Sequence, residues 1–207
     1  MLGDVVSSRQ HPDQTALIHE LSRALREALG HIPEGSILQP PEVTIGDEFQ
    51  GAFTELAGAL QFVLLVQLKL ARSIDLRFGI GHGSIEAYDP SRAPLGQSGS
   101  AWWAARNSID AVKAAQSERG SYRSCAFESA DRTLGGAVEA MLTLRDRLMN
   151  DLDEKDLAIA LGLATGEPQA AIAKAIGIDP AAVSRRKYTN AIDALLAAHE
   201  ALTRRAE

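Results

Sequence analysis

The chain has 207 residues, a formal net charge of −6 and an apolar fraction of 45%. Its length suits a body domain of roughly 150 residues followed by a helical module of roughly 50, and its apolar content excludes a disordered chain. The acidic balance excludes a surface that binds nucleic acid throughout, so any such contact needs a local basic patch. The single cysteine, Cys125, excludes an intramolecular disulfide and favours a buried, inert thiol.

No segment has the pattern of a targeting signal or a membrane span. The chain does not begin with the basic and apolar regions of a signal peptide. Its longest apolar stretch, residues 60–70, is interrupted by Gln61, Gln67 and Lys69 and is too short and polar to cross a bilayer. We therefore expect a cytoplasmic protein without membrane contact.

The first 150 residues alternate between strand and helix patterns. Residues 1–6 are apolar like a buried strand, and because such strands are usually longer, the natural chain can begin upstream. In residues 13–29 a leucine recurs at every fourth position, which predicts a helix face. The expected elements are a strand at 1–6, a helix at 13–29, a hairpin of 36–45 and 49–53, a helix at 56–73, a strand at 74–81 continued past a kink through 83–87, a loop at 88–98, a helix at 101–116, a strand at 122–127 and a helix at 131–149 with Asp131 as its N-cap.

A hairpin enclosed by two βα crossovers is the split βαβ, or ferredoxin-like, pattern. The predicted class is therefore α/β (α+β) with a ferredoxin-like sheet, followed by an all-α module. Both signs of charge are dense in residues 145–156, which predicts a solvated junction between helices. We place an α/β domain over 1–150 and a helical domain over 151–207.

The helical domain predicts short helices at 157–166, 167–176 and 181–190. Gly177 ends the second helix, and Asp179 caps a third that starts at Pro180. The spacing Gln-x-x-Ile-Ala-x-x-Ile-Gly-Ile-x-x-x-x-Val-Ser resembles the helix-turn-helix of LuxR-type and sigma-factor-like regulators. An apolar stripe indicates that the third helix runs on to residue 202, where it either packs on the α/β domain or pairs with a second copy in a homodimer.

A local basic patch lies in this motif. Between residues 169 and 190 the sequence has four basic residues and only one acidic residue, Asp179. Arginine and lysine there can neutralise phosphates, while Ser184 and Arg185 can reach base edges in a major groove. The sequence predicts DNA contacts from Gln169, Ser184, Arg185, Arg186, Lys187 and Tyr188. Helix-turn-helix units also serve as protein-interaction modules, which is the competing interpretation.

Two acidic residues stand at strand ends of the α/β domain. Asp4 closes the first strand and Asp47 tips the hairpin, and in a split βαβ sheet these elements are neighbours, so the carboxylates can converge. With the backbone carbonyl of Val5 they would offer the hard oxygen ligands that Mg²⁺ prefers. Bound Mg²⁺ would in turn hold the phosphates of a nucleotide. The alternative is that Asp4 caps a loop and Asp47 only serves the tight turn.

Three segments, Gly3–Arg9, Thr44–Gly51 and Arg77–Gly83, resemble in order three landmarks of class III nucleotide cyclases. The middle segment also resembles the Gly-Gly-Asp-Glu-Phe hairpin of diguanylate cyclases. Together with Gly99–Arg106 and the terminal helix-turn-helix, the set resembles the SatD family over nearly the full chain. The resemblance implies a nucleotide-cyclase-like palm.

Carried over to single residues, the resemblance implies that Asp4 and Asp47 are metal ligands and that Arg106 is the helix arginine that meets phosphate. Two positions depart from the cyclase pattern. Val43 stands where adenylyl cyclases carry the lysine that helps to recognise adenine, and Trp102 stands where they carry the asparagine that steadies the transition state. The pattern therefore supports nucleotide binding better than cyclase turnover.

Two further groups allow two interpretations each. Gly79, Gly81 and Gly83 can cradle a phosphate or allow close packing, with packing favoured. Trp102 and Trp103 can be a core anchor with a partner at the rim, or a surface on which a base stacks, with the anchor favoured.

These patterns predict a DNA-binding regulatory protein whose cyclase-like domain binds a nucleotide or another small phosphorylated ligand through Mg²⁺. The alternative is a divergent nucleotide cyclase or nucleotidyl transferase that the helix-turn-helix only localises. A third interpretation is a degenerate palm that serves as a dimerisation unit.

Overall fold

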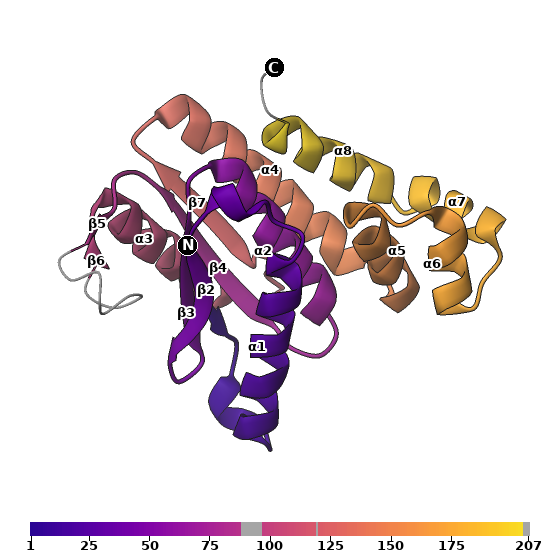
Figure 1. Cartoon of the computed structure of the whole chain (residues 1–207), viewed down its shortest axis with the longest axis horizontal. Helices are drawn as coiled ribbons and strands as arrows, with labels where there is room; N and C mark the ends of the chain where they lie inside the picture. The colour runs from indigo at the N-terminus through magenta and orange to yellow at the C-terminus, as the bar shows by residue number, and fades with distance from the viewer. Residues whose placement is uncertain (88–96, 119, 205–207) are drawn as a thin grey trace.

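The computed structural model describes residues 1–87, 97–118 and 120–204. Its body is built on a five-stranded sheet of order β2-β3-β1-β4-β7 (Figure 1). The central strand β1 is antiparallel to both β3 and β4, while β7 lies parallel to β4 at the edge. The strands are β1 (Leu2–Val5), β2 (Ile37–Ile45), β3 (Glu48–Phe53), β4 (Leu76–His82) and β7 (Cys125–Ser129). The mixed α+β class is confirmed, and the first four strands have the split βαβ order that the sequence predicts.

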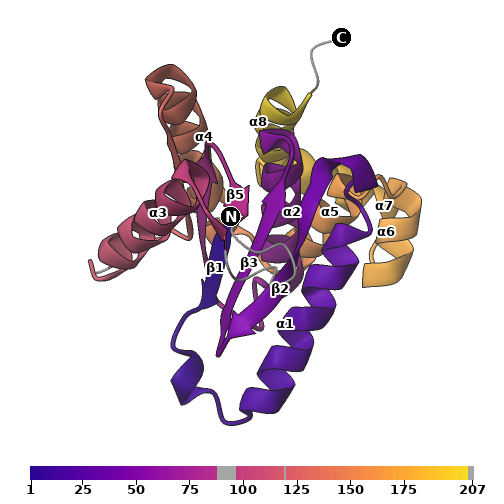
Figure 2. The same ribbon diagram turned by 60° about the vertical axis from the view of Figure 1, so that its left-hand side comes forward.

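Helices cover both faces of the sheet. Figure 2 shows the strands between α3 on one side and α1 and α2 on the other. The main core joins strand residues to α1, α2 and α4, whereas Leu2 packs on α3 through Ala105 and Ile109. These helices are α1 (Gln14–Leu29), α2 (Leu56–Leu70), α3 (Ser100–Gln116) and α4 (Arg132–Asp151). Short 3₁₀ turns, η1 (Ser8–Gln10) and η2 (Glu34–Ser36), precede α1 and β2.

The glycines of β4 and the residue after it let α3 lie directly on the strand. A Cβ atom at Gly79 would lie 2.1 Å from the carbonyl oxygen of Ala105. One at Gly81 would lie 2.2 Å from the carbonyl oxygen of Ala101, and one at Gly83 would lie 2.3 Å from Oγ of Ser100, the first residue of α3. Because real Cβ atoms do not approach oxygen this closely, these glycines serve helix packing, the interpretation that the sequence favours.

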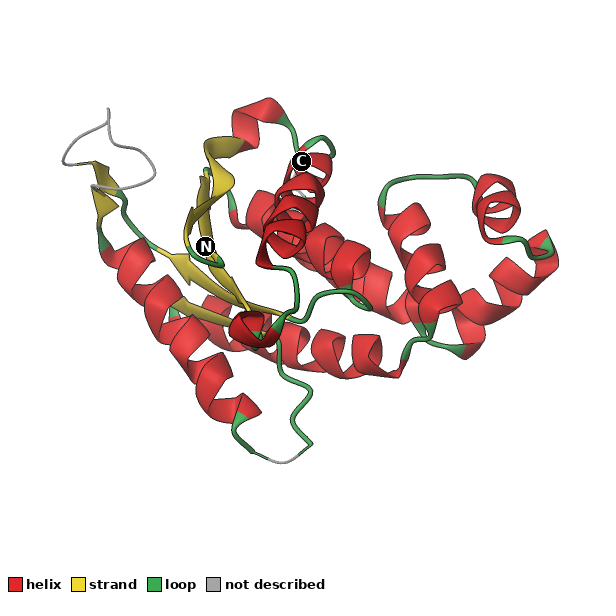
Figure 3. Ribbon diagram, turned by 90° about the horizontal axis from the view of Figure 1, so that it is seen from below, coloured by secondary structure: helices red, strands yellow, loops and turns green. Residues whose placement is uncertain are grey.

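Four shorter helices follow the body, and Figure 3 shows most of them to one side of the sheet. They are α5 (Glu154–Ala164), α6 (Gln169–Ile176), α7 (Pro180–Thr189) and α8 (Ile192–Thr203). The turn between α6 and α7 places Gly177 at a φ of 67°, in the left-handed region that favours glycine. Leu64 and Leu68 of α2 belong to the same apolar cluster as α5 to α8, so the helical part shares a core with the body.

Four of the predicted boundaries are wrong. Residues 83–87 do not extend β4, because β5 (Glu86–Ala87) pairs with β6 (Gln97–Ser98) in a separate two-stranded sheet. The predicted loop at 88–98 therefore ends in a strand, and its residues 88–96 lie outside the described residues. The strand predicted at 122–127 begins only at Cys125. The third helix of the C-terminal motif does not run on, because Ala191 has a φ of 56° and separates α7 from α8.

The junction at 145–156 is solvated over most of its charged residues, as predicted, because Arg147, Asp151, Asp153, Glu154 and Lys155 are exposed, but three of its charges are buried. Arg145 and Asp146 near the end of α4 are each 2% exposed, and Asp156 in α5 is 3% exposed. The apolar stripe of α8 faces the body, where the helix packs on α2 and α4. None of the described helices is both long enough and apolar enough to span a bilayer.

Candidate functional site

Asp4 lies at the end of β1, on the α3 side of the sheet, with its side chain 7% exposed. The residue directly opposite on β4 is Arg77, whose Nη1 lies 3.1 Å from Oδ1 of Asp4. Lys113 of α3 approaches from above the sheet, with Nζ 2.8 Å from Oδ2. Both oxygens of this carboxylate are therefore engaged by cations.

Asp47 lies at the tip of the β2–β3 hairpin, directly after Gly46, which has a φ of 64°. Its Oδ2 accepts a hydrogen bond from the backbone N–H of Val5 at 3.2 Å. The hairpin tip therefore rests against the end of β1. On the α3 side of the same hairpin, Nη1 of Arg106 lies 3.6 Å from Oε1 of Glu48, and both side chains are about half exposed.

These groups, as arranged, do not fit a magnesium ion. Arg77 and Lys113 already contact both oxygens of Asp4 and would compete with a divalent cation for them. Within the described ranges, no cluster of three or more His, Cys, Asp or Glu side chains is placed to hold a metal. A metal at the predicted site of Asp4, Asp47 and Val5 would have to displace at least one of these cations.

A chain of polar contacts continues from this site along the same end of the sheet. Nε of Arg77 donates to Oε1 of Gln116 at 2.6 Å, and Nε2 of Gln116 donates to the carbonyl oxygen of Arg123 at 2.7 Å. Arg123 in turn donates to Oε1 of Glu139 on α4 at 2.5 Å. The ends of β4 and α3 are thus tied to α4 through the segment that precedes β7.

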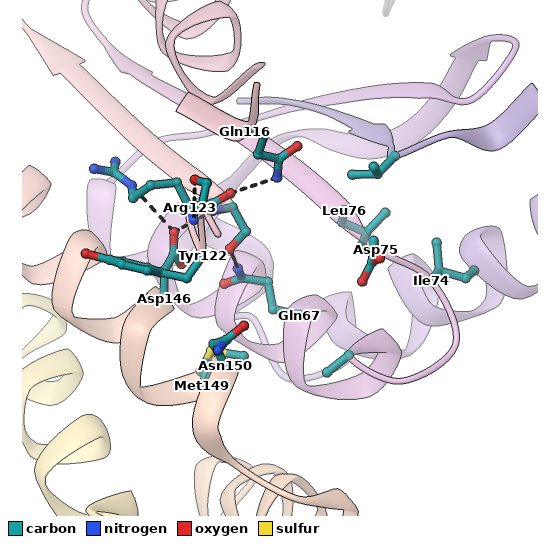
Figure 4. Close-up of a pocket in the computed structure, with 14 residues that line it drawn as sticks. Gln67, Ile74, Asp75, Leu76, Gln116, Tyr122, Arg123, Asp146, Met149 and Asn150 are labelled. Atoms are coloured by element: carbon teal, nitrogen blue, oxygen red, sulfur yellow. Dashed lines mark hydrogen bonds and ion pairs between the residues drawn. The ribbon is translucent and has the colours of Figure 1, made fainter. Parts of the chain in front are cut away.

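The chain of contacts borders a cavity of about 410 Å³ between the ends of α2, α3 and α4 (Figure 4). Val6, directly after β1, lines it, as do Ala71, Ile74, Leu76 and Met149. Its polar lining comes from Gln67, Asp75, Gln116, Ser121, Tyr122, Arg123, Ser124, Asp146 and Asn150. The volume and the mixture of apolar and polar walls are typical of small-molecule pockets.

Asp146 is the most deeply buried charged group of this lining, with a fully buried side chain. Its Oδ2 accepts from the backbone N–H groups of Ser124 at 2.7 Å and Cys125 at 2.8 Å. Nε of Arg123 lies 3.9 Å from the same oxygen. The other oxygen, Oδ1, is buried without a hydrogen-bond partner in the described part of the chain.

Behind the cavity wall lies Arg145. Its Nη2 donates to Oε1 of Gln67 at 2.8 Å and lies 3.1 Å from the sulfur of Cys125. Gln67 uses its Nε2 to donate to Oγ of Ser124 at 2.7 Å. Burial raises the pKa of the Cys125 thiol to about 12, and the burial that the sequence favours is confirmed.

The α6–α7 unit presents a second candidate surface. Ile172, Ala173 and Val183 are buried between the helices, as the motif predicts. On the outside, Arg185 is exposed and Tyr188 is 63% exposed. Nζ of Lys187 lies 5.2 Å from the centre of the Tyr188 ring, while Ser184 and Gln169 are half-buried.

Arg186 differs from its neighbours. Its Nη1 lies 2.8 Å from Oδ2 of Asp153 and 2.7 Å from Oδ1 of Asp156, and the side chain of Asp156 is 4% exposed. Asn190 adds a hydrogen bond to the same carboxylate at 2.8 Å. Arg186 therefore fastens α7 to the start of α5.

The family model of the SatD family matches residues 1–201, which is nearly the whole chain. The chain belongs to the SatD family. No curated protein and no solved structure is similar enough to this SatD-family chain to count as a match.

Sequence reasoning missed Arg145, Asp146 and Asp156 of this SatD-family protein as buried polar groups, whereas it placed His199 in the apolar stripe of the last helix. His199 on α8 is 4% exposed, and its Nε2 lies 2.8 Å from Oε1 of Gln61. Burial, followed by the positive charge of Arg145, lowers the pKa of His199 to about 3. Only the spacing of His199 within the apolar stripe of α8 could have indicated its burial.

Proposed function

We propose that this SatD-family protein is a DNA-binding regulator that reads a duplex with its α6–α7 unit, used as a helix-turn-helix. The observation that carries the proposal is the outer surface of α7, where Arg185, Lys187 and Tyr188 are solvent-accessible on a helix whose other face is fixed by Val183. In a chain with a formal net charge of −6, this concentration of cations favours an anionic partner.

The geometry of the turn supports the same use. Gly177 lets α7 leave the end of α6 at a sharp angle, and Asp179 caps α7 by accepting from the N–H of Ala181 at 2.7 Å. A recognition helix enters a major groove with its first turns, so Ser184 and Arg185 can reach base edges while Lys187 contacts a phosphate. Arg186 is occupied by acidic partners and is left out of the proposed interface.

DNA binding is tested by fluorescence anisotropy with random-sequence duplex over a series of salt concentrations. We expect the logarithm of the affinity to fall linearly with the logarithm of salt concentration. Replacing Lys187 by alanine should reduce the slope by about 1. The matched control is Arg204→Ala, which removes a cation from the 72% exposed side chain of Arg204 at the end of α8. Absence of salt-dependent binding to any duplex would remove the proposal.

For the body we propose a regulatory role, with a nucleotide or phosphorylated ligand as the predicted effector of a cyclase-like palm. The strand order supports a palm of this kind. The ion pairs of Asp4 give no support to a site that transfers phosphoryl groups through Mg²⁺, and no catalytic step is derived from them. The enzyme alternative predicts product from ATP or GTP with Mg²⁺ or Mn²⁺ that is lost in Asp47→Asn, and such product would replace the regulatory role.

Of the two roles that the sequence allows for the apolar stripe of α8, packing on the body is supported over pairing with a second copy. The helix packs on α2 and α4 of its own chain, and Leu195 is 2% exposed there. A dimer would therefore need another surface. Sedimentation equilibrium of the full chain measures its oligomeric state directly.

A further inference from the structure

We propose that Lys113 is an internal counter-ion that takes the place of a divalent cation at Asp4. The body would then hold this carboxylate without metal, and the ammonium group of Lys113 would keep a latent metal site closed. The resemblance to cyclases implies a metal at the end of β1, and the contacts of Asp4 disagree with it. The proposal concerns the body alone and depends neither on DNA binding nor on the identity of an effector.

Asp4 needs positive charge nearby because its side chain is only 7% exposed. A carboxylate that leaves water is stable only where cations or several N–H donors replace its hydration. Each oxygen of Asp4 has one cation: Nη1 of Arg77 lies 3.1 Å from Oδ1, and Nζ of Lys113 lies 2.8 Å from Oδ2. Two cations against one carboxylate leave an excess of positive charge, which would repel an added Mg²⁺ ion.

The two cations are held in different ways. Arg77 lies opposite Asp4 on β4, and its Nε also donates to Oε1 of Gln116 at 2.6 Å, so its guanidinium group is fixed by two partners. Lys113 comes from α3, and its side chain is 37% exposed, which places it on the solvent side of the buried carboxylate. An ion that approached Oδ2 from solvent would therefore meet the ammonium group of Lys113.

The reach of Lys113 follows from the packing of α3. Gly79 lets this helix lie directly on β4, since a Cβ atom there would lie 2.1 Å from the carbonyl oxygen of Ala105. Lys113 stands about two helical turns beyond Ala105. On a helix so close to the sheet, its side chain extends past β4 to β1, the neighbouring strand that carries Asp4. The same close packing thus brings the internal cation to the carboxylate.

Asp47 would complete the latent metal site. It lies beside the end of β1, where its Oδ2 accepts from the backbone N–H of Val5 at 3.2 Å. A backbone N–H brings no full positive charge, so the negative charge of Asp47 stays available to a cation. Without the ammonium group of Lys113, Oδ2 of Asp4 and the carboxylate of Asp47 would offer the hard oxygen ligands that Mg²⁺ and Mn²⁺ prefer, with water as the remaining ligands.

The test measures thermal unfolding of the full chain in EDTA and in Mn²⁺, together with the electron paramagnetic resonance signal of free Mn²⁺. The wild type should unfold at the same temperature in both conditions and leave the Mn²⁺ signal unchanged. Lys113→Ala should unfold at a lower temperature in EDTA, because Oδ2 of Asp4 loses its cation. In Mn²⁺ the variant should regain about 2–4 °C, because the ion binds the folded state, and the free Mn²⁺ signal should fall.

Matched variants separate a metal site from a loss of folding. Lys113→Gln keeps a polar side chain without the charge and repeats the test where Lys113→Ala does not fold. Lys113→Arg, which keeps the charge, and Lys155→Ala, at an exposed position of α5, should respond to Mn²⁺ no more than the wild type. Adding Asp4→Asn to Lys113→Ala should remove the response. The proposal is overturned if the wild type binds Mn²⁺ in a way that Asp4→Asn abolishes, or if neither uncharged variant of Lys113 gains a response that depends on Asp4.

Discussion

Arg186 Nη1 lies 2.7 Å from Oδ1 of Asp156, a contact that joins α7 to α5. Asp156 is buried beneath it, and Asp153 accepts from the same guanidinium nitrogen at 2.8 Å. The adjacent Arg185 is exposed. Two consecutive arginines of one helix therefore have different roles, one in the fold and one at the surface.

Replacing Arg186 by alanine should destabilise the protein by about 1–3 kcal/mol, because Asp156 would stay buried without its cation. Replacing Arg185 should change the free energy of unfolding by no more than about 0.5 kcal/mol. Urea unfolding of both variants measures the difference. Equal stabilities of the two variants would contradict the structural role of Arg186.

The substitution Asp4→Asn distinguishes between two interpretations of this carboxylate, an ion-paired residue and a metal ligand. In the structure, Asp4 neutralises Arg77 and Lys113, so its loss should cost about 1–3 kcal/mol in the presence of EDTA. If Asp4 and Asp47 were instead a repelling pair of metal ligands, the substitution would stabilise the metal-free protein. Thermal unfolding in EDTA decides the sign. Asp110→Asn, at an exposed position of α3, is the matched control.

The packing of α3 on β4 predicts opposite effects of two glycine substitutions. Gly79→Ala should cost about 3 kcal/mol or more, because its Cβ would lie 2.1 Å from backbone oxygen. Gly136→Ala should add about 0.5–1 kcal/mol, because Gly136 lies in α4 with open space around the new Cβ. Denaturant midpoints compare the two. A mild loss in Gly79→Ala would show that α3 can retreat from the strand.

The buried imidazole of His199 predicts acid sensitivity. Burial and the charge of Arg145 lower its pKa from 6.5 to about 3, so the folded state favours the neutral ring. The stabilisation is complete above about pH 6.5 and decreases as the pH falls toward 3, by at most about 1.4 kcal/mol per unit.

His199→Gln should flatten this part of the stability profile, since glutamine does not titrate. Urea unfolding of the wild type and the variant between about pH 7 and pH 4 provides the comparison. Other titrating groups, including the buried Met1 amine, are common to both chains. Parallel profiles would mean that His199 does not become charged on unfolding in this range.

The spacing of apolar residues was sufficient to predict the elements that bury one face. The leucines of α1 at 17, 21 and 25 are buried as their spacing predicts, and Leu76, Phe78 and Ile80 alternate into the core from β4. The start of β7 was misplaced for a physical reason. The N–H groups of Ser124 and Cys125 donate to the side chain of Asp146, which the strand pattern does not reveal.

The candidate sites were also predicted only in part. The sequence correctly placed the hairpin tip beside the end of β1, where Asp47 meets the backbone of Val5. It did not show that Lys113 of α3 reaches Asp4, because that contact depends on how closely α3 lies on β4. In a sequence, a dense run of charges indicates a segment exposed to solvent. Arg145 and Asp146 are nevertheless buried, because α4 packs on α2 and the sheet.

The side-chain amide of Gln67 has a consequence for how the cavity wall can change. Its oxygen faces the guanidinium of Arg145 and its nitrogen faces the hydroxyl of Ser124, so turning it over would set donor against donor on the arginine side. The amide therefore has one orientation that satisfies both neighbours. A rearrangement of that wall that turned the amide would break its hydrogen bond with Arg145.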